Sequence, residues 1–180
     1  QGGGEATVIA WKWARTVKCP NPACGCEMPL VNNFELSKKK GKEAWIEPHF
    51  EEGKATYEVH LSGKPKLEGT VNRKGAVCAC CGTPVPFTYI REQGRLGTMF
   101  SQMMAVVAEG RGGRKYLSAT AAQQQASEVD KPIDYPYGEL FGKATVNVGN
   151  YGFDTYDTLF TNRQLTALTT FSDLVAEAQQ

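Results

Sequence analysis

The sequence predicts an α+β protein that is mainly antiparallel β, carries two cysteine-bearing turns and ends in an amphipathic helix. Two observations predict the β part: most segments before residue 119 alternate apolar and polar residues, and glycine-containing turns separate them. The third observation is the C-terminal segment, where apolar residues recur at the spacing of one helix face. We expect a β-rich region at 1–118, a linker or irregular segment at 119–158 and a helix at 159–180.

The first expected strand is TVIAWKWARTV, residues 7–17, in which large residues occupy alternate positions. This alternation places Trp11 and Trp13 on one face of a sheet, and we expect both indoles to pack into the core. Arg15 interrupts that face. Stacking on nucleic-acid bases is the alternative role for these tryptophans and for Trp45.

Two cysteine clusters follow, at residues 19–30 (CPNPACGCEMPL) and 78–87 (CACCGTPVPF). Both contain a Cys-Gly pair, then three residues, then proline and a large apolar residue, and we interpret them as a short internal repeat. Each copy has an earlier cysteine, so each turn offers two thiols, and two such pairs suit the four-ligand tetrahedron of Zn²⁺. The sequence therefore predicts a zinc ribbon with a structural zinc ion. Its expected ligands are Cys19, Cys24, Cys78 and Cys81.

Disulfide bonds are the main alternative for the six cysteines. A disulfide scaffold is typical of small secreted chains with more than about 8% cysteine, whereas this chain has six cysteines in 180 residues and no signal-like apolar start. Cys26 and Cys80 stand outside the repeated pairs, and either could compete for the same ion. His49 has no ligand-like spacing to a cysteine, and His60 is expected to face solvent from a strand.

Further strands are expected between and after the cysteine clusters. Residues 34–48 are typical of two strands joined by a basic turn at Gly41, 51–63 continue the meander, and 70–78 lead into the second cluster. The segment VPFTYI, residues 85–90, alternates again and is also expected to be a strand.

A hairpin is expected at residues 104–117, where GRGG forms the turn. The glycines of this turn also invite comparison with a phosphate-binding loop. We favour the hairpin, because a nucleotide-binding loop needs a preceding strand, a following helix and fuller spacing.

The last segment, residues 159–180, has a signal for the start of a helix and an apolar face. Thr161 followed three residues later by Gln164 is the signature of a capping box, which predicts a helix beginning at this point. We expect the apolar face to dock on the body of the chain or on a neighbour that is missing from this sequence. Its members are Leu165, Leu168, Phe171, Leu174 and Val175.

Charge is divided unevenly along the chain, although the net charge is only +1. Residues 1–118 carry 17 Lys and Arg against 11 Glu, and residues 119–180 carry three basic against eight acidic residues. A basic N-terminal part can meet phosphate. The longest strongly apolar run, residues 103–108, is too short to span a bilayer, so we expect no membrane association and a cytoplasmic location. The QGGGE start, without methionine, is typical of a piece excised from a longer protein, and equally of a processed or trimmed terminus.

Several segments together resemble the central insert of bacterial and archaeal adenine-specific DNA methylase-like proteins that contain a zinc ribbon. The resemblance covers nearly the whole chain and rests on these segments: WARTVKCPNPACG, LSKKKGKEAW, GTVNRKGAVC, CGTPVPFTYIREQGRLG, MAVVAEGRGGRKYL and LFTNRQLTALTTFSDLV. It implies that the parent is a S-adenosylmethionine-dependent enzyme whose cofactor loop and catalytic motif lie outside this chain. It also implies that Cys26 and Cys80 are free thiols, because relatives usually have other residues there.

The chain itself shows neither a cofactor loop nor the Pro-Pro-aromatic motif with which an adenine methylase holds a flipped base. The closest string, DYPY at residues 134–137, has tyrosine where the first proline belongs and lies in turn-like sequence. We therefore expect S-adenosylmethionine to be a cofactor of the parent protein and not of this chain.

Two functional classes follow from these observations. The first is a zinc-stabilised insert that recognises substrate, with DNA as a candidate partner; its candidate phosphate contacts are Lys38, Lys39, Lys40, Lys42, Arg73 and Lys74. A solvated hairpin tip is the favoured alternative for the same side chains, because runs of charge at turns need no partner. The second class is a purely structural zinc module that docks on the methyltransferase core of the parent or on another protein. A stand-alone enzyme is disfavoured, since no nucleophile, base and orienting group converge in the sequence.

Overall fold

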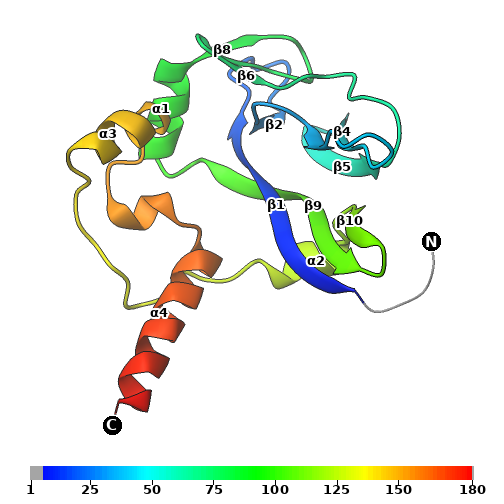
Figure 1. The fold of residues 1–180 in the computed structure, drawn as a ribbon. Coiled ribbons are helices and arrows are strands. Elements are labelled where there is room, and N and C mark those ends of the chain that lie inside the picture. Colours follow the sequence, from blue (N-terminus) through cyan, green and yellow to red (C-terminus); the bar gives the residue numbers. More distant parts are fainter. Residues whose placement is uncertain (1–5, 180) are drawn as a thin grey trace.

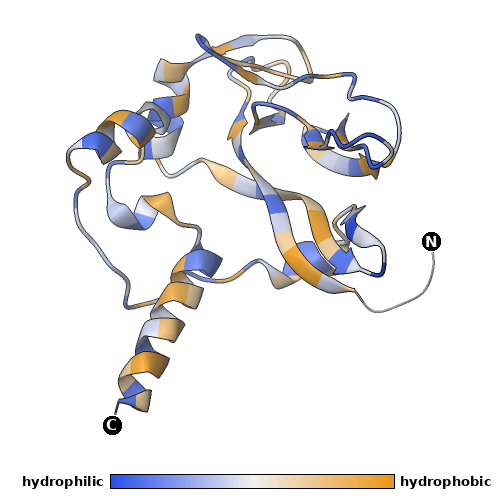
Figure 2. Ribbon diagram, viewed as in Figure 1, coloured by the Kyte–Doolittle hydropathy of each residue, from blue (hydrophilic) through white to orange (hydrophobic). Residues whose placement is uncertain are grey.

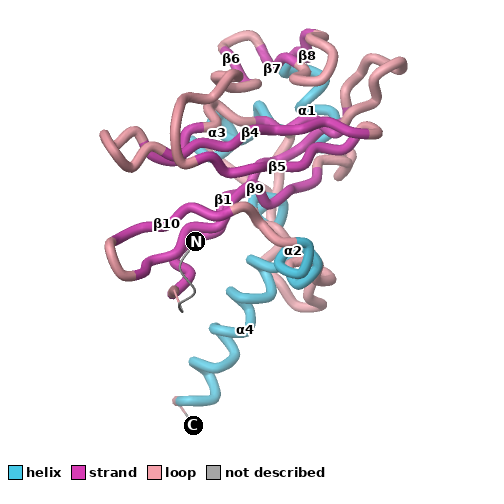
Figure 3. Tube along the Cα trace, turned by 90° about the vertical axis from the view of Figure 1, so that its right-hand side faces the viewer, coloured by secondary structure: helices cyan, strands magenta, loops and turns pink. Residues whose placement is uncertain are grey.

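The computed structural model of the protein describes residues 6–179 and is α+β with mainly antiparallel strands, as the sequence predicts. A long sheet runs through the centre, a small sheet lies across part of it, and a third sheet sits at one end beside the first helix (Figure 1). The C-terminal helix lies at the other end of the molecule in both views (Figures 1 and 3).

The central sheet has the strand order β10-β9-β1-β2. Its strands are β1 (Thr7–Lys18), β2 (Glu27–Leu30), β9 (Phe100–Gly110) and β10 (Gly113–Leu117). All neighbouring strands are antiparallel, and the β9–β10 connection is the hairpin expected at GRGG. The glycines at 112 and 113 both have positive φ angles, 93° and 103°, which explains why this turn needs them.

The tryptophans of β1 do not pack into the core as the alternation predicts. The alternation itself is retained from Trp11 onward, because the register shift between Lys12 and Trp13 skips a residue of β9 and not of β1. The core lies on the opposite face of the strand, where Ala14 and Thr16 are buried, whereas Trp11 is 53% exposed. Trp13 is half-buried.

The second sheet has the order β3-β4-β5 and contains β3 (Glu35–Ser37), β4 (Ala44–Glu51) and β5 (Lys54–His60). The predicted turn at Gly41 is confirmed, with a φ of 74°. This sheet packs on the central one: Phe34 and Ile46 share a buried cluster with Ala14 and Met104. The Tyr57 hydroxyl also donates to the Gln102 side-chain oxygen at 3.0 Å, which joins β5 to β9.

The third sheet has the order β6-β7-β8 and consists of very short strands: β6 (Val71–Asn72), β7 (Gly75–Val77) and β8 (Pro84–Pro86). Helix α1 (Phe87–Arg95) follows directly. The strand expected over residues 85–90 is therefore wrong beyond Pro86. The six residues 85–90 are also compatible with the start of a helix, because Phe87 and Ile90, three positions apart, lie on the same helix face. Ile90 is fully buried there, and Phe87 packs edge-on against Tyr151 with ring centroids 6.1 Å apart.

Residues 119–158 contain short helices joined by irregular chain. These are α2 (Ala121–Ala126), α3 (Lys143–Val148) and the 3₁₀ turns η1 (Gly149–Tyr151) and η2 (Tyr156–Leu159). Gly94 of α1 and Gly152, directly after η1, each lie so close to a backbone carbonyl of the other segment that a β-carbon would collide with it. Helix α1 and η1 are therefore in close backbone contact. The DYPY string lies between α2 and α3, outside any helix or strand.

Helix α4 (Asn162–Ala178) begins where the capping box predicts. The Gln164 side-chain oxygen accepts a hydrogen bond from the Thr161 backbone N–H at 2.9 Å. Of the predicted apolar face only Leu165 is buried, and Phe171 is 69% exposed. Figure 2 shows apolar residues along this helix as it projects from the rest of the chain. The body of the chain therefore buries only Leu165 of this face, and docking of the rest on a neighbour stays a prediction. No helix within residues 6–179 combines the length and apolarity needed to cross a membrane.

Candidate metal centre

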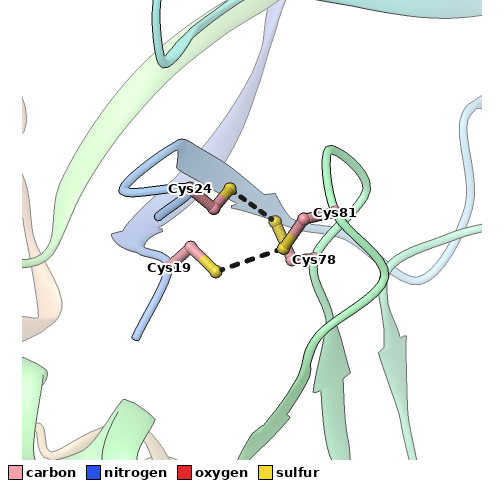
Figure 4. A group of neighbouring side chains, drawn as sticks. All are labelled: Cys19, Cys24, Cys78 and Cys81. Atoms are coloured by element: carbon pink, nitrogen blue, oxygen red, sulfur yellow. Dashed lines mark hydrogen bonds between the residues drawn. The ribbon is translucent and has the colours of Figure 1, made fainter. Parts of the chain in front are cut away.

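Two hairpins carry the cysteine clusters and hold them face to face (Figure 4). Residues 19–26 connect β1 to β2, and residues 78–83 connect β7 to β8. Each contact between sulfurs joins one hairpin to the other: Cys19 Sγ lies 3.7 Å from Cys81 Sγ, and Cys24 Sγ lies 3.9 Å from Cys78 Sγ. The site therefore bridges the central sheet and the third sheet.

The two hairpin loops share one backbone pattern, as the internal repeat predicts. The Gly25 N–H donates to the Asn21 carbonyl at 2.9 Å, and the Gly82 N–H donates to the Cys78 carbonyl at 2.8 Å. Both glycines have positive φ angles, 54° and 74°, which a residue with a β-carbon rarely adopts. The Cys-Gly pair thus turns the chain so that Cys24 and Cys81 face the opposite hairpin.

The loops differ in length, and this difference explains the unequal cysteine spacing. The Cys19 N–H donates to the Cys26 carbonyl at 2.8 Å, and the Cys78 N–H donates to the Thr83 carbonyl at 2.9 Å. Each first cysteine is therefore the first residue of its loop, and the first loop spans two more residues. In the first turn, Asn21 takes the backbone position that Cys78 has in the second.

All four predicted ligands come together. The Sγ atoms of Cys19, Cys24, Cys78 and Cys81 lie within 4.8 Å of one another, and this group could hold a metal ion. No disulfide joins the six cysteines, and contacts of 3.7 and 3.9 Å are far longer than the roughly 2.05 Å of an S–S bond. The disulfide alternative is therefore not the arrangement of this structure.

The four thiols have different surroundings. Cys19 and Cys78 are buried, and burial raises the pKa of both. Cys81 is exposed, and a hydrogen bond with the Thr83 hydroxyl, at 3.1 Å, lowers the pKa of its thiol to about 6. A metal ion takes thiolates as ligands, so binding at this site must displace the protons that the buried pair retains.

Two residues beside the sulfurs were not anticipated from the sequence. The Asn21 side-chain amide lies 3.9 Å from Cys81 Sγ and donates to the Thr83 hydroxyl at 3.4 Å. Its side-chain oxygen accepts from the Ala23 N–H at 3.0 Å, which fixes the first turn. The internal repeat could have pointed to both residues: when the two copies are aligned on their Cys-Gly pairs, Asn21 aligns with Cys78 and Thr83 aligns with Cys26.

The remaining thiols, Cys26 and Cys80, lie outside the four-sulfur group. Cys26 is fully buried among apolar residues such as Val17, Met28 and Ile90, and burial raises the pKa of its thiol to about 12. Cys80 is exposed. The two thus differ in reactivity: a buried, protonated thiol is inert, and an exposed one is accessible to reagents.

The histidines are also outside the cluster. His60 is half-buried and not solvated as predicted, because its ring stacks on Trp45 with centroids 4.5 Å apart. Its Nε2 atom lies 2.9 Å from a Glu47 carboxylate oxygen. His49 is exposed, 3.6 Å from Glu58.

The predicted phosphate contacts separate into two places. The turn between β3 and β4 carries Lys38, Lys39, Lys40 and Lys42, whereas Arg73 and Lys74 form the turn between β6 and β7. Figures 1 and 3 show β6 and β10 well apart. The Lys42 Nζ donates to the Gly112 carbonyl at 3.0 Å, so the lysine turn belongs to the β10 end.

The chain matches no protein-family model, no curated protein and no solved structure in the comparisons with known proteins.

Proposed function

We propose that the protein is a structural zinc module in which one zinc ion joins the two cysteine hairpins as a zinc ribbon. The distances between sulfurs carry this proposal. Zinc–thiolate bonds of about 2.3 Å in a tetrahedron place the sulfurs about 3.8 Å apart. The two contacts between the hairpins, 3.7 and 3.9 Å, have this length. A zinc ion bound by four cysteines has no open coordination position for water or substrate, so its role is structural.

The third sheet is the part of the fold that needs such a link. Its strands have only two or three residues each, and sheets this small require support from packing or from a metal. Around the site, Val85 and Ile90 pack with Cys19 and Cys78 in one buried cluster. Zinc would fix this cluster, and with it helix α1, on the end of the central sheet.

Within a larger protein, this module serves as the recognition or scaffolding insert of a S-adenosylmethionine-dependent, DNA adenine methyltransferase-like enzyme, with the methyltransferase core as its partner. The support for this part of the proposal is the sequence resemblance stated above, including the two Cys-Gly turns. The cofactor and the catalytic motif belong to the parent enzyme.

A second function, contact with a nucleic-acid backbone, is favoured by the meeting of two turns. The Lys42 hydrogen bond to Gly112 brings the β3–β4 turn against the β9–β10 turn. Together they border a cavity of about 310 Å³ whose lining includes Lys42, Arg111, Arg114 and Lys115 and one acidic residue, Glu43. Among the described residues none of these four basic side chains has an ion pair. Such a group suits phosphate.

The metal proposal is tested by elemental analysis and thiol labelling of the purified chain. We expect one zinc per chain, protection of four thiols from alkylation, and rapid labelling of the exposed Cys80. Chelation should then open the four ligand thiols to the reagent. Absence of zinc together with a mass loss from two disulfides would falsify the proposal.

Variants at the two remaining thiols provide matched controls. Cys80→Ser and Cys26→Ser should each retain one zinc per chain, because neither sulfur belongs to the four-sulfur group. If either variant lost the metal as completely as a ligand variant, the assignment of the four ligands would be wrong.

A further inference from the structure

A cleft of about 750 Å³ lies between the central sheet and the beginning of helix α4, and none of its lining residues is a cysteine. Trp13 and Arg15 of β1 and Ser101 of β9 contribute to one wall, and Asn162 and Arg163 of α4 contribute to another. Arg15 pairs with Ser101 across the strands. The segment from 124 to 130 borders the cleft as well.

Two arginines enter this cleft from elements far apart in sequence, and each is held by an aromatic ring. The guanidinium carbon of Arg163 lies 3.4 Å from the ring centroid of Trp13, and that of Arg15 lies 5.0 Å from the centroid of Phe153. A guanidinium stacked on a ring keeps its N–H edge available for other partners. The stacking therefore orients both groups without using their donors.

The hydrogen bonds of these arginines leave most donors without an acceptor in the described part of the chain. Arg163 Nη1 lies 3.5 Å from the Ser101 hydroxyl, and Arg15 Nη2 lies 3.5 Å from the Leu159 carbonyl oxygen. Both contacts are long for hydrogen bonds. Since a guanidinium has five N–H donors, each arginine can still bind an oxyanion with two donors at once.

The two charges are also uncompensated. Within residues 6–179, neither arginine lies within ion-pair distance of a carboxylate. Glu27, Glu128 and Asp130 line the cleft without making such a pair. Burial lowers the pKa of both arginines, and the charge of Arg15 lowers that of Arg163 further. An anion between them would relieve this repulsion.

Helix α4 adds to the positive potential. It is 17 residues long and begins at Asn162, beside Arg163. The N-terminus of a helix of this length favours negative charge within its first turn. Its effect adds to that of the two guanidinium groups.

From these contacts we propose that the cleft binds an oxyanion of the phosphate class, gripped by Arg15 and Arg163 at the start of α4. Two sources can supply this phosphate, a small free phosphate compound or the backbone of a single-stranded nucleic acid, and the same two arginines recognise both. The site differs from the Lys42 and Arg111 surface and does not depend on the zinc ion.

The test is a titration of the zinc-loaded chain at low salt, followed by calorimetry and by NMR of the arginine Nε–Hε signals. The probes are inorganic pyrophosphate and a short single-stranded oligonucleotide. We expect the signals of Arg15 and Arg163 to shift with at least one probe. Saturation by pyrophosphate assigns the site to small phosphates, and saturation by the oligonucleotide alone assigns it to a nucleic-acid backbone.

Variants distinguish this cleft from other basic surfaces. Arg15→Gln and Arg163→Gln should each weaken binding at least about tenfold, while Arg163→Lys, which retains charge without the planar fork, should have an intermediate effect. Arg111→Gln is the matched control, because it removes the same charge outside the cleft and should leave these arginine shifts unchanged.

Folding is checked by zinc content and by circular dichroism of every variant. The proposal would be overturned if the Nε–Hε signals of both arginines stayed unchanged with each probe at millimolar concentration. So would binding that is lost in Arg111→Gln and retained in Arg15→Gln, because the anion would then occupy the two turns. In that case the zinc proposal would be unaffected, since the metal content is measured independently.

Discussion

Replacing Cys78 by serine should remove the zinc ion and loosen the third sheet. The Cys78 side chain is 1% exposed, and its sulfur lies 3.9 Å from that of Cys24. A serine hydroxyl does not ionise at neutral pH and has a shorter bond to its β-carbon, so it does not replace the thiolate.

The size of the effect follows from the four-ligand geometry. A structural zinc site contributes roughly 10–16 kcal/mol of apparent binding free energy at neutral pH, so an equal share is about 2.5–4 kcal/mol for each ligand. Since 1.4 kcal/mol corresponds to a factor of ten, Cys78→Ser should bind zinc about 60- to 700-fold more weakly.

The assay is competition for zinc against a chromophoric chelator, with Cys80→Ser as the control. Cys80 is two residues away, exposed and outside the four-sulfur group, so this variant should keep the zinc affinity of the unmodified chain. Equal affinities for Cys78→Ser and the unmodified chain would refute the reasoning. An equal loss in both variants would show that a different set of sulfurs binds the metal.

Three other outcomes are expected. Acidification from neutral pH to about pH 5 should release zinc, because protons compete with the metal for four thiolates; full metal retention at that pH would argue against a thiolate site. Weak binding to a labelled DNA duplex should decrease steeply as salt increases, because each neutralised phosphate releases counterions. Lys42→Glu should abolish this binding, whereas Lys74→Glu, on the separate β6–β7 turn, should have a smaller effect. Binding that is insensitive to both salt and Lys42→Glu would exclude the surface formed by the β3–β4 and β9–β10 turns. Calorimetry with S-adenosylmethionine should show no heat of binding, since the chain has no cofactor loop, and a micromolar affinity would contradict this.

Local signals were sufficient for the cysteine hairpins and for the limits of several elements. The repeated Cys-Gly pairs predicted four ligands because positive φ at Gly25 and Gly82 is a property of the turn itself. The start of α4 was equally local, since Thr161 and Gln164 are within one helical turn. These features need no knowledge of the remaining chain.

Features that depend on distant partners were missed. The bulge beside Trp13 is defined by pairing with β9, and neither strand alone shows it. Residues 85–90 fit a strand or a helix by periodicity, and helix α1 packs against the segment near Tyr151, far along the chain. The hydrogen bond from Lys42 to Gly112 and the stacking of Arg163 on Trp13 likewise connect segments that are far apart in the sequence.

X-ray absorption spectroscopy at the zinc edge tests the central claim most directly. Four sulfur neighbours at about 2.3 Å, with no nitrogen or oxygen in the first shell, are predicted from a site made of Cys19, Cys24, Cys78 and Cys81. A first shell that contains nitrogen or oxygen, or a purified chain without zinc, would contradict the account.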